Sequence, residues 1–336
     1  MLRRAAIIYN PASGRTRGRA ERADRMARLL ETRGIPTETS PTSGPGAGAK
    51  LARDAVAAGA DLIVSYGGDG TLNEIIQSIA GTNVPLAIWA GGTANVAARD
   101  LGLPSSPERL AGVIAAGKTR RIALGVAKAV HQPQLGVQEP DTAGVGSAYT
   151  SGPSQKPADT AGSEARPDGS GPRGHYFFMF AGIGLDAAVC RLVNHRLKRA
   201  VGQLAYVVSG LEQLIDWRPE PFTVEVDGKR FETCFALVAN GKSYGGGIKM
   251  TPSARLEDPW FELFMIPPDR TRSGLIWDAA TCLLGMPGRS SAMTASGRSV
   301  TANSSLQPWV EVDGEVLAQL PMSFQIEPDA LTVIVP

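Results

Sequence analysis

Apolar residues in the first third of the chain follow two alternating patterns. Short continuous runs at residues 5–9, 62–66 and 85–90 predict strands that are buried on both faces. Elsewhere apolar residues recur every three or four positions, which predicts helices with one buried face. These faces are formed by Ala23, Met26, Ala27 and Leu30, and by Leu72, Ile75, Ile76 and Ile79. Strands that alternate with helices predict an α/β unit of three layers around a mostly parallel sheet.

The second half of the chain is dominated by strand patterns. Candidate strands cover residues 177–181, 222–226, 234–239, 261–266 and 309–312. Asp227-Gly228 and Asp313-Gly314 are typical of two-residue hairpin turns. Helices are expected near residues 187–215 and 273–284. This half predicts a β-rich, sandwich-like domain, and a closing strand at 331–335 fits either domain.

The change of pattern predicts a domain boundary after residue 124. We expect an α/β domain at 1–124, which residues 320–336 could rejoin, and a β-rich domain at 125–319. Residues 131–173 are dense in Gly, Pro, Ser, Thr and Ala and have few large apolar side chains. Such a segment cannot bury enough surface to offset the entropy lost on ordering, so we interpret it as a mobile insertion.

Charge and cysteine content exclude several classes of protein. The 34 Lys and Arg nearly balance the 32 Asp and Glu, giving a formal charge of +2, which argues against a nucleic-acid binder. Cys190, Cys234 and Cys282 are widely separated, which favours reduced thiols and a cytoplasmic location. The longest apolar stretch, 274–286, is shorter than the ~20 residues of a membrane span and contains Asp278.

Three glycine-rich turns follow strands of the α/β domain. They are Asn10-Pro11-Ala12-Ser13-Gly14, Gly67-Gly68-Asp69-Gly70-Thr71 and Gly91-Gly92-Thr93-Ala94-Asn95. In an open α/β sheet these turns project from the carboxyl ends of the strands, where ligands bind. Glycines let backbone N–H groups approach phosphate oxygens, so the three turns together indicate a nucleotide triphosphate with a metal ion.

Asp69 has two interpretations. It is either a turn aspartate that caps the following helix, or a carboxylate that acts on Mg²⁺ or on an acceptor hydroxyl. The sequence contains neither a P-loop signature nor a protein-kinase catalytic loop, so the expected nucleotide site is of another kind.

A family resemblance rests on motifs spread along almost the whole chain. Residues 65–74, Ser-Tyr-Gly-Gly-Asp-Gly-Thr-Leu-Asn-Glu, resemble the signature of the diacylglycerol kinase catalytic domain, which sphingosine and ceramide kinases share. The resemblance continues, in the family's order, through residues 8–11, 91–95, 182–186, 244–247, 252–258 and 312–315. It is closest to the bacterial soluble branch, and it implies an ATP-dependent lipid kinase with a lipid-substrate domain in the β-rich half.

The resemblance implies a role for individual residues. Asp69 and Asp313 are the two candidates for the catalytic base, and Asp69 also organises Mg²⁺ and the γ-phosphate. Asp186 faces the lipid headgroup, and Lys198 and Arg199 are weaker candidates for phosphate contact. The nucleotide contacts are Asn10, Ser13, Gly14, Gly67, Gly68, Gly70, Thr71, Glu74, Gly92, Thr93, Asn95 and Glu315.

Two positions depart from the family pattern. Glu257-Asp258-Pro259 stands where the family has Asp-Asp-Gly, a segment that carries a structural metal in some bacterial relatives. Asp258 keeps the matching carboxylate, whereas Pro259 changes the local backbone. Val96 replaces an acidic residue found after the asparagine in many relatives, so no role is transferred to position 96.

Other interpretations remain open at this point. Asp313 could be an ordinary hairpin residue, as we assume for Asp227, and only Glu315 and the family context distinguish the two turns. The acceptor could be a soluble molecule, as in NAD kinase or phosphofructokinase, or the scaffold could bind lipid without catalysis. We expect a cytoplasmic protein peripheral to the inner face of the membrane that meets its lipid there; the sequence leaves a homodimer open.

Overall fold

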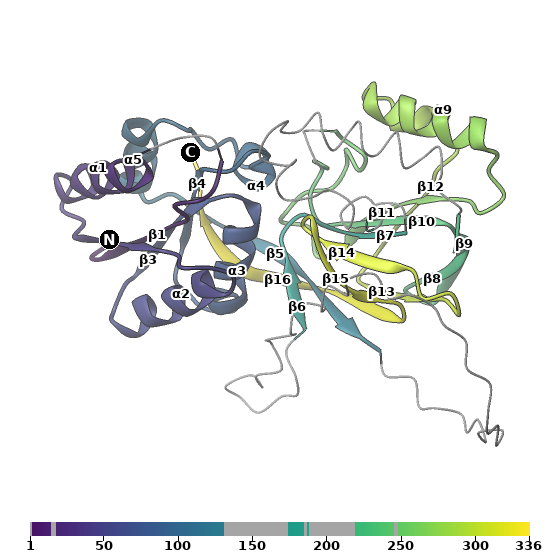
Figure 1. Cartoon of the computed structure of the whole chain (residues 1–336), viewed down its shortest axis with the longest axis horizontal. Coiled ribbons are helices and arrows are strands. Elements are labelled where there is room, and N and C mark those ends of the chain that lie inside the picture. The colour runs from purple at the N-terminus through teal and green to yellow at the C-terminus, as the bar shows by residue number, and fades with distance from the viewer. Residues whose placement is uncertain (1, 15–17, 131–173, 185–186, 188–218, 245–247) are drawn as a thin grey trace, which may run out of the picture.

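Two β-sheets organise the chain (Figure 1). The computed structural model describes residues 2–14, 18–130, 174–184, 187, 219–244 and 248–336. The described strands are β1 Ala5–Tyr9, β2 Thr37–Pro41, β3 Leu62–Gly67, β4 Leu86–Ala90, β5 Thr119–Ala129, β6 His175–Phe177, β7 Phe180–Ile183, β8 Phe222–Val226, β9 Lys229–Thr233, β10 Phe235–Ala239, β11 Phe261–Ile266, β12 Met293–Gly297, β13 Ser299–Asn303, β14 Trp309–Val312, β15 Glu315–Gln319 and β16 Met322–Ile334. The helices are α1 Arg19–Glu31, α2 Ala47–Ala57, α3 Asp69–Ile79, α4 Val96–Asp100, α5 Pro107–Ala116, α9 Arg272–Leu283 and the 3₁₀ turn η2 Pro287–Arg289.

The N-terminal part is a parallel sheet between two layers of helices. Strands β2, β1, β3 and β4 lie side by side in parallel register. Successive residues of a strand face opposite sides, so Ile7 packs with α1 and α5 while the neighbouring Ile8 packs with α2 and α3. Burial on both faces is the reason that β1 and β3 are continuous apolar runs.

Strand β16 extends this sheet into the C-terminal half. Val333 pairs with Leu86 of β4 in parallel, whereas the same strand pairs antiparallel with β5 and β13. Among the described residues, the result is one sheet of ten strands, in the order β2-β1-β3-β4-β16-β13-β8-β9, with β5 and β6 attached through β16. The predicted closing strand is therefore shared by both halves of the chain.

The second sheet is antiparallel, and its described part has six strands, in the order β12-β11-β10-β7-β14-β15. It packs face to face on the C-terminal part of the first sheet. Between them lie fully buried aromatic side chains, including Phe177, Phe261 and Phe324. This architecture confirms the predicted fold class, an α/β unit with a mostly parallel sheet followed by a β-sandwich.

One predicted strand is wrong in a way that matters for the site. Residues 177–181 do not form one strand: β6 ends at Phe177 and β7 begins at Phe180. Strand β6 pairs with β5 in the first sheet, and β7 pairs with β10 and β14 in the second. The chain therefore crosses between sheets at Phe178 and Met179, and the N–H groups there need partners outside the ladders.

The remaining predictions divide between described and undescribed residues. Helix α9 confirms the helix expected near 273–284. The helix expected at 187–215 and the insertion at 131–173 lie outside the described residues, apart from Ala187. In the part of the chain that the structure describes, we find no helix with both the length and the apolar character needed to cross a bilayer.

Candidate active site

The three glycine-rich turns meet at one edge of the parallel sheet. They leave the carboxyl ends of β1, β3 and β4, which are neighbours in the sheet. Backbone hydrogen bonds link the turns: Asn10 N–H donates to Tyr66 O at 3.0 Å, and Gly91 N–H donates to Gly67 O at 2.8 Å. The structure thus brings together the turns that the sequence singled out.

The second and third turns touch through their glycines. A Cβ atom on Gly92 would lie 2.5 Å from the Cα of Gly68, and a Cβ on Gly67 would lie 2.6 Å from the Thr71 side chain. Both separations are far below van der Waals contact: a larger residue at position 92 forces the two main chains apart, and one at position 67 collides with the Thr71 side chain. Glycine is needed here because two main chains approach each other closely.

The first turn is fastened to the other two. Asn10 Nδ2 donates to Thr71 Oγ1 at 3.3 Å, and Ser13 Oγ donates to Gly91 O at 3.3 Å. Gly14 has φ +63°, and a Cβ there would lie 2.5 Å from Gly91 O. Asn10, Ser13, Gly14 and Thr71 therefore form one connected group.

Asp69 joins two helix N-termini. It is the first residue of α3, and its Oδ1 accepts the N–H of Val96, the first residue of α4, at 2.9 Å. A carboxylate at this end of a helix is favoured by the helix dipole. Its position beside Gly68 and Gly92 places it where the turns converge.

Asn95 shapes the third turn from within. Its φ of 48° lies in the left-handed region, which asparagine tolerates better than most residues. Its Oδ1 accepts Gly92 N–H at 2.7 Å, and its Nδ2 donates to Gly92 O at 2.8 Å. Thr93, between them, is exposed at the surface of the turn.

Glu74 of α3 contacts the N-terminus of α2. Its two carboxylate oxygens accept the N–H groups of Gly46, at 2.9 Å, and Gly48, at 2.8 Å. These groups lie at the N-terminus of α2, so the carboxylate caps that helix. These contacts connect Glu74 with α2, and a nucleotide contact for this residue stays a prediction.

The β14–β15 hairpin comes to α3 from the other half of the chain. Asp313, in the turn, accepts N–H groups from Phe178 at 2.7 Å, Met179 at 2.9 Å and Phe180 at 3.2 Å. These are the groups left without ladder partners where the chain changes sheets. A fourth donor, Asn73 Nδ2 of α3, lies 3.1 Å from Asp313 Oδ2.

Burial and hydrogen bonding act on the Asp313 carboxyl in opposite directions. Burial disfavours the charged form and raises the pKa of Asp313 to about 6, against the hydrogen bonds from the Phe178, Met179 and Phe180 amides and from Asn73, which lower it. A pKa of this size lies near neutrality, where a general base is most effective.

Glu315 reaches the second turn. A Cβ atom on Gly70 would lie 2.6 Å from Glu315 Oε1, so this exposed carboxylate lies directly over the start of α3. The hairpin therefore contributes two acidic residues, Asp313 and Glu315, next to the turn that carries Asp69.

The Asp227-Gly228 turn is an informative comparison. Asp227 and Asp313 have nearly the same φ, 46° and 49°, and both accept backbone N–H groups from another segment. Asp227 receives them from Arg298 and Ser299. What distinguishes Asp313 is therefore its burial and its bond to Asn73 rather than its turn type.

Two residues that the sequence interpretation left without a role belong to this group. Asn73 is 4% exposed, and besides Asp313 it contacts Tyr176 O and Gln77 Nε2. His175 Nε2 lies 3.1 Å from Asn73 Oδ1, and burial lowers the pKa of His175, which favours the neutral ring. Both flank the contact between α3 and the hairpin.

Arg19 is a third residue of the site to which the sequence interpretation gave no role. It is 4% exposed, donates from Nη2 to Gly91 O, and lies 4.8 Å from the centroid of the Tyr66 ring. In the described part of the chain its Nε and Nη1 have no hydrogen-bond partner. Burial lowers its pKa. The sequence did contain a signal of this burial: Arg19 precedes Ala23 by four residues, so it extends the apolar face of α1 by one turn.

Other predicted residues lie elsewhere. Asp186, Lys198 and Arg199 fall outside the described residues. Asp258 has a local contact, in which its Oδ2 accepts Arg255 N–H at 3.2 Å. Within residues 2–14, 18–130, 174–184, 187, 219–244 and 248–336, no three His, Cys, Asp or Glu gather as a metal site. A metal at Asp258 stays a prediction.

Comparison with known proteins agrees with this geometry. Residues 4–127 match the profile of the diacylglycerol kinase catalytic domain, and residues 180–335 match that of the YegS C-terminal NAD kinase beta sandwich-like domain. A crystal structure of a diacylglycerol kinase from Bacillus anthracis str. Sterne superposes with a TM-score of 0.71 at 20% identity, covering 100% of this chain and 98% of that one.

Sequence relatives extend over the same span. A diacylglycerol kinase from Mycobacterium tuberculosis (strain H37Rv) is 27% identical over 84% of this chain and 79% of its own. A diacylglycerol kinase from Bacillus subtilis (strain 168) is 30% identical over 329 residues, which are 96% of this chain and 93% of the relative. Such identity across both halves shows that the chain belongs to the diacylglycerol kinase family.

Proposed function

We propose that the chain transfers the γ-phosphoryl group of ATP to the hydroxyl of a lipid alcohol, with diacylglycerol as the first candidate. The observation that carries this proposal is the convergence of three glycine-rich turns around Asp69, with Asp313 and Glu315 brought beside them from the other half of the chain. The names of the relatives supply the choice of acceptor.

The turns supply what a triphosphate needs. Their main chains approach closely without side chains between them, and α3 presents its N-terminus to the same place. Within the proposal, Asn10, Ser13, Gly14, Gly67, Gly68, Gly70, Thr71, Gly92, Thr93 and Asn95 hold the nucleotide. Arg19 lies behind them and adds a buried positive charge next to the phosphates.

Magnesium fits the carboxylates around Gly70. This ion is commonly held by one or two carboxylates together with substrate phosphates, and it keeps several waters. Asp69, with Glu315 over the same turn, matches that donor set, and the bound ion would neutralise charge on the phosphates. No cluster of three acidic side chains is required for such a site.

The lipid hydroxyl must lose its proton as the phosphoryl group arrives. Two observations on Asp313 point in different directions. Its pKa of about 6 suits a base, whereas each of its oxygens already accepts two hydrogen bonds, so accepting a proton displaces one donor. Asp69 is the other candidate base, and the pH dependence of kcat/KM in wild type separates the two.

The test is transfer of labelled γ-phosphate from ATP, with Mg²⁺, to an extracted lipid mixture. NAD and fructose 6-phosphate serve as parallel soluble acceptors, and Asp69→Asn and Asp313→Asn are compared with Asp227→Asn. We expect a labelled lipid whose formation is lost in the first two variants and kept in the third. Labelled soluble product without labelled lipid would overturn the lipid assignment.

A second readout separates a weak enzyme from a silent scaffold. Titration calorimetry with Mg-ATP measures nucleotide binding independently of the acceptor. Binding without transfer to any acceptor contradicts the proposed reaction while keeping the nucleotide site. Absence of binding contradicts both.

A further inference from the structure

Helix α9 carries an inverted distribution of side chains. Its inward-facing residues include Asp278 and Thr281, both about 3% exposed, beside Leu275 and Cys282. On the helix and its extension, large apolar side chains face outward. They are Ile276 at 50% exposed, Trp277 at 59%, Leu283 at 40%, Leu284 at 71% and Met286 at 37%. We call these five residues the α9 apolar face.

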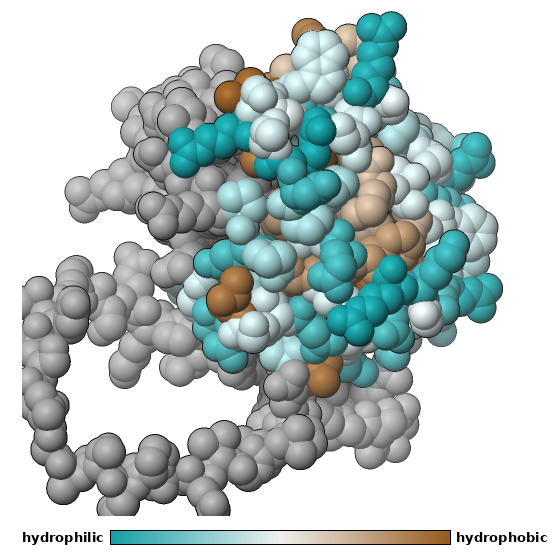
Figure 2. All heavy atoms as spheres, turned by 90° about the vertical axis from the view of Figure 1, so that its right-hand side faces the viewer, coloured by the Kyte–Doolittle hydropathy of each residue, from teal (hydrophilic) through white to brown (hydrophobic). Residues whose placement is uncertain are grey.

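The helix stands at the outer edge of the β-sandwich. Figure 1 shows α9 projecting beyond the strands at the upper right, after β11 and before β12. Figure 2 looks onto this side of the molecule and shows brown, apolar atoms reaching the surface at its upper rim. Water-facing helices normally place polar residues outward, so this face lacks the arrangement expected for free solvent.

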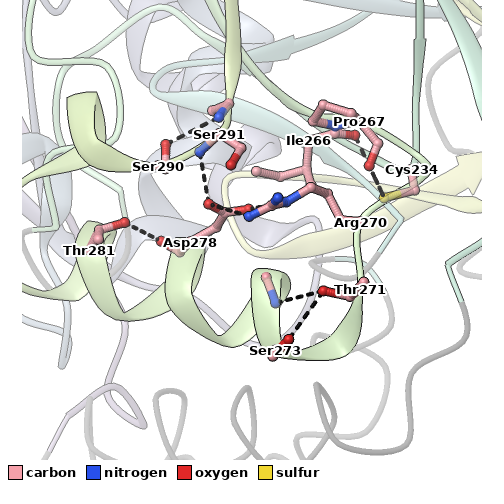
Figure 3. Close-up of polar contacts among 12 residues, drawn as sticks. Cys234, Ile266, Pro267, Arg270, Thr271, Ser273, Asp278, Thr281, Ser290 and Ser291 are labelled. Atoms are coloured by element: carbon pink, nitrogen blue, oxygen red, sulfur yellow. Dashed lines mark hydrogen bonds and ion pairs between the residues drawn. The ribbon is translucent and has the colours of Figure 1, made fainter.

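A polar clamp fixes the orientation of α9 (Figure 3). Asp278 receives Arg270 Nε at 3.1 Å and Nη2 at 3.4 Å, and it accepts the N–H of Ser291 at 2.8 Å. Thr271 caps the helix by accepting Gly274 N–H at 3.2 Å. Turning the apolar face inward would break the ion pair between Asp278 and Arg270 and the hydrogen bond from Ser291, so these contacts hold the apolar side chains outward.

The exposed charges near α9 are mainly basic. Arg272 begins the helix and Arg289 lies in η2 just beyond it, and both are exposed. Asp269 is the exposed acid next to Arg270, so the exposed charges of residues 269–292 sum to +1, from two arginines and one aspartate. Arginines at both ends of an apolar helix face match an anionic surface.

We propose that the α9 apolar face docks the chain on an anionic lipid bilayer, with Arg272 and Arg289 over the headgroups. The helix would lie in the plane of the interface, where tryptophan is favoured and where an amphipathic helix buries one face. This inference rests on the proposed function, since a lipid acceptor resides in that bilayer. The α9 apolar face would be the surface that holds the chain on the bilayer, a role that none of the active-site residues has.

A second copy of the chain fits the face less well. The α9 apolar face consists of five side chains, whereas a stable protein interface uses about 20–30 residues on each side. Stable protein interfaces bury about 800 Å² on each partner. If two copies paired their α9 helices antiparallel, Arg272 of one copy would lie near Arg289 of the other. Asp269 is the exposed acid that could offset this repulsion.

The test is co-sedimentation with vesicles, without ATP. Wild type is compared with Trp277→Glu/Leu284→Glu on phosphatidylcholine vesicles and on vesicles that also contain phosphatidylglycerol. Leu306→Glu is the matched control, because Leu306 is 56% exposed but lies in the β13–β14 connection. We expect the double variant to bind about tenfold or more weakly and the control to bind as wild type does.

The arginines give an independent readout. Arg272→Gln and Arg289→Gln should each weaken binding to the anionic vesicles by about fivefold, and added salt should reduce the difference. Binding to phosphatidylcholine alone should change little. Equal vesicle binding by wild type and the double variant overturns the proposal, as does a wild type that binds neither vesicle.

Two controls separate this inference from the proposed function and from self-association. Phosphorylation of a short-chain diacylglycerol in detergent should be unchanged in Trp277→Glu/Leu284→Glu. If neither protein phosphorylates it while only wild type binds vesicles, the proposed acceptor fails and the docking surface stands. Sedimentation that shows a wild-type dimer lost in the variant, without any change in vesicle binding, assigns the face to a second copy instead.

Discussion

Asn73 Nδ2 lies 3.1 Å from Asp313 Oδ2, and 240 positions of sequence separate the two residues. This bond connects the first turns of α3, which begins at Asp69, with the β14–β15 hairpin. Because Asp313 also holds the backbone where the chain changes sheets, both halves meet at one carboxylate. The candidate bases are thus positioned relative to each other by Asn73.

Asp313→Ala should destabilise the fold as well as remove a candidate base. It leaves four donors without an acceptor, at about 1–3 kcal/mol for each buried group, so we expect a loss of roughly 4 kcal/mol or more. Asp227→Ala should cost about 1 kcal/mol, because water can replace the carboxylate at an exposed turn. Denaturant unfolding measures both, and similar losses would contradict the anchoring role.

Stability should depend on pH through Asp313. Since burial raises its pKa to about 6 from 3.8, the folded chain retains a proton between these values that the unfolded chain has released. Its contribution to stability therefore falls as the pH rises through this window, by up to about 1.4 kcal/mol per pH unit, and is level above it. The difference in unfolding free energy between wild type and Asp313→Asn, followed from about pH 4 to about pH 7, measures this slope.

The same pKa makes a prediction about rate. If Asp313 accepts the proton of the lipid hydroxyl, kcat/KM should fall below about pH 6 as the carboxyl becomes protonated. A profile that stays flat through pH 6 in wild type, combined with loss of activity in Asp69→Asn, would assign the base to Asp69.

Glycines of the turns should differ in their tolerance of alanine. Gly92→Ala meets backbone, the Cα of Gly68, and should cost about 1–3 kcal/mol and raise KM for ATP at least about tenfold. Gly70→Ala meets the end of the flexible Glu315 side chain and should cost less than about 1 kcal/mol. Unfolding and initial rates at varied ATP measure these effects.

Gly112 provides the control for these substitutions. It lies within α5, and a Cβ there has nothing within 4 Å, so Gly112→Ala should be neutral or stabilise by up to about 1 kcal/mol. Loss of ATP affinity in this variant would mean that KM reports general changes in the fold rather than the turns.

Arg19→Met should separate stability from nucleotide binding. Among the described residues, two nitrogens of this buried guanidinium have no hydrogen-bond partner and only Nη2 donates, to Gly91 O, so its removal should leave stability unchanged or raise it. Loss of a positive charge near the phosphates should raise KM for ATP by about tenfold. Arg22→Met is the control, because Arg22 lies on the same helix and donates to Tyr66 Oη at 3.0 Å. Equal KM values in the two variants would refute a nucleotide role for Arg19.

The sequence predicted elements whose burial is visible in local spacing. The apolar runs of β1 and β3 and the face of α1 were identified because each pattern is complete within a few residues. Strand β2, Thr37–Pro41, was missed because it is an edge strand with few apolar residues and no buried position.

Features that depend on distant residues could not be predicted in this way. The break at Phe178 and Met179 is stabilised by Asp313, which lies more than a hundred positions away and resembles an ordinary turn residue. The turns around Asp69 were grouped correctly because the carboxyl ends of neighbouring parallel strands must lie at one edge. The hydrogen bond between Asn73 and Asp313 could not be predicted in the same way, because no general rule of sheet geometry brings these two residues together.

The position of β16 in the chain constrains how the protein can be made. Synthesis runs from the N-terminus, and residues 322–334 follow every other described element. Until they leave the ribosome, β4, β5 and β13 each lack the neighbour with which they pair. The ten-stranded sheet, to which both halves contribute, therefore stays incomplete until β16 is made, so the nascent chain exposes the unpaired edges of β4, β5 and β13, which chaperones protect from aggregation.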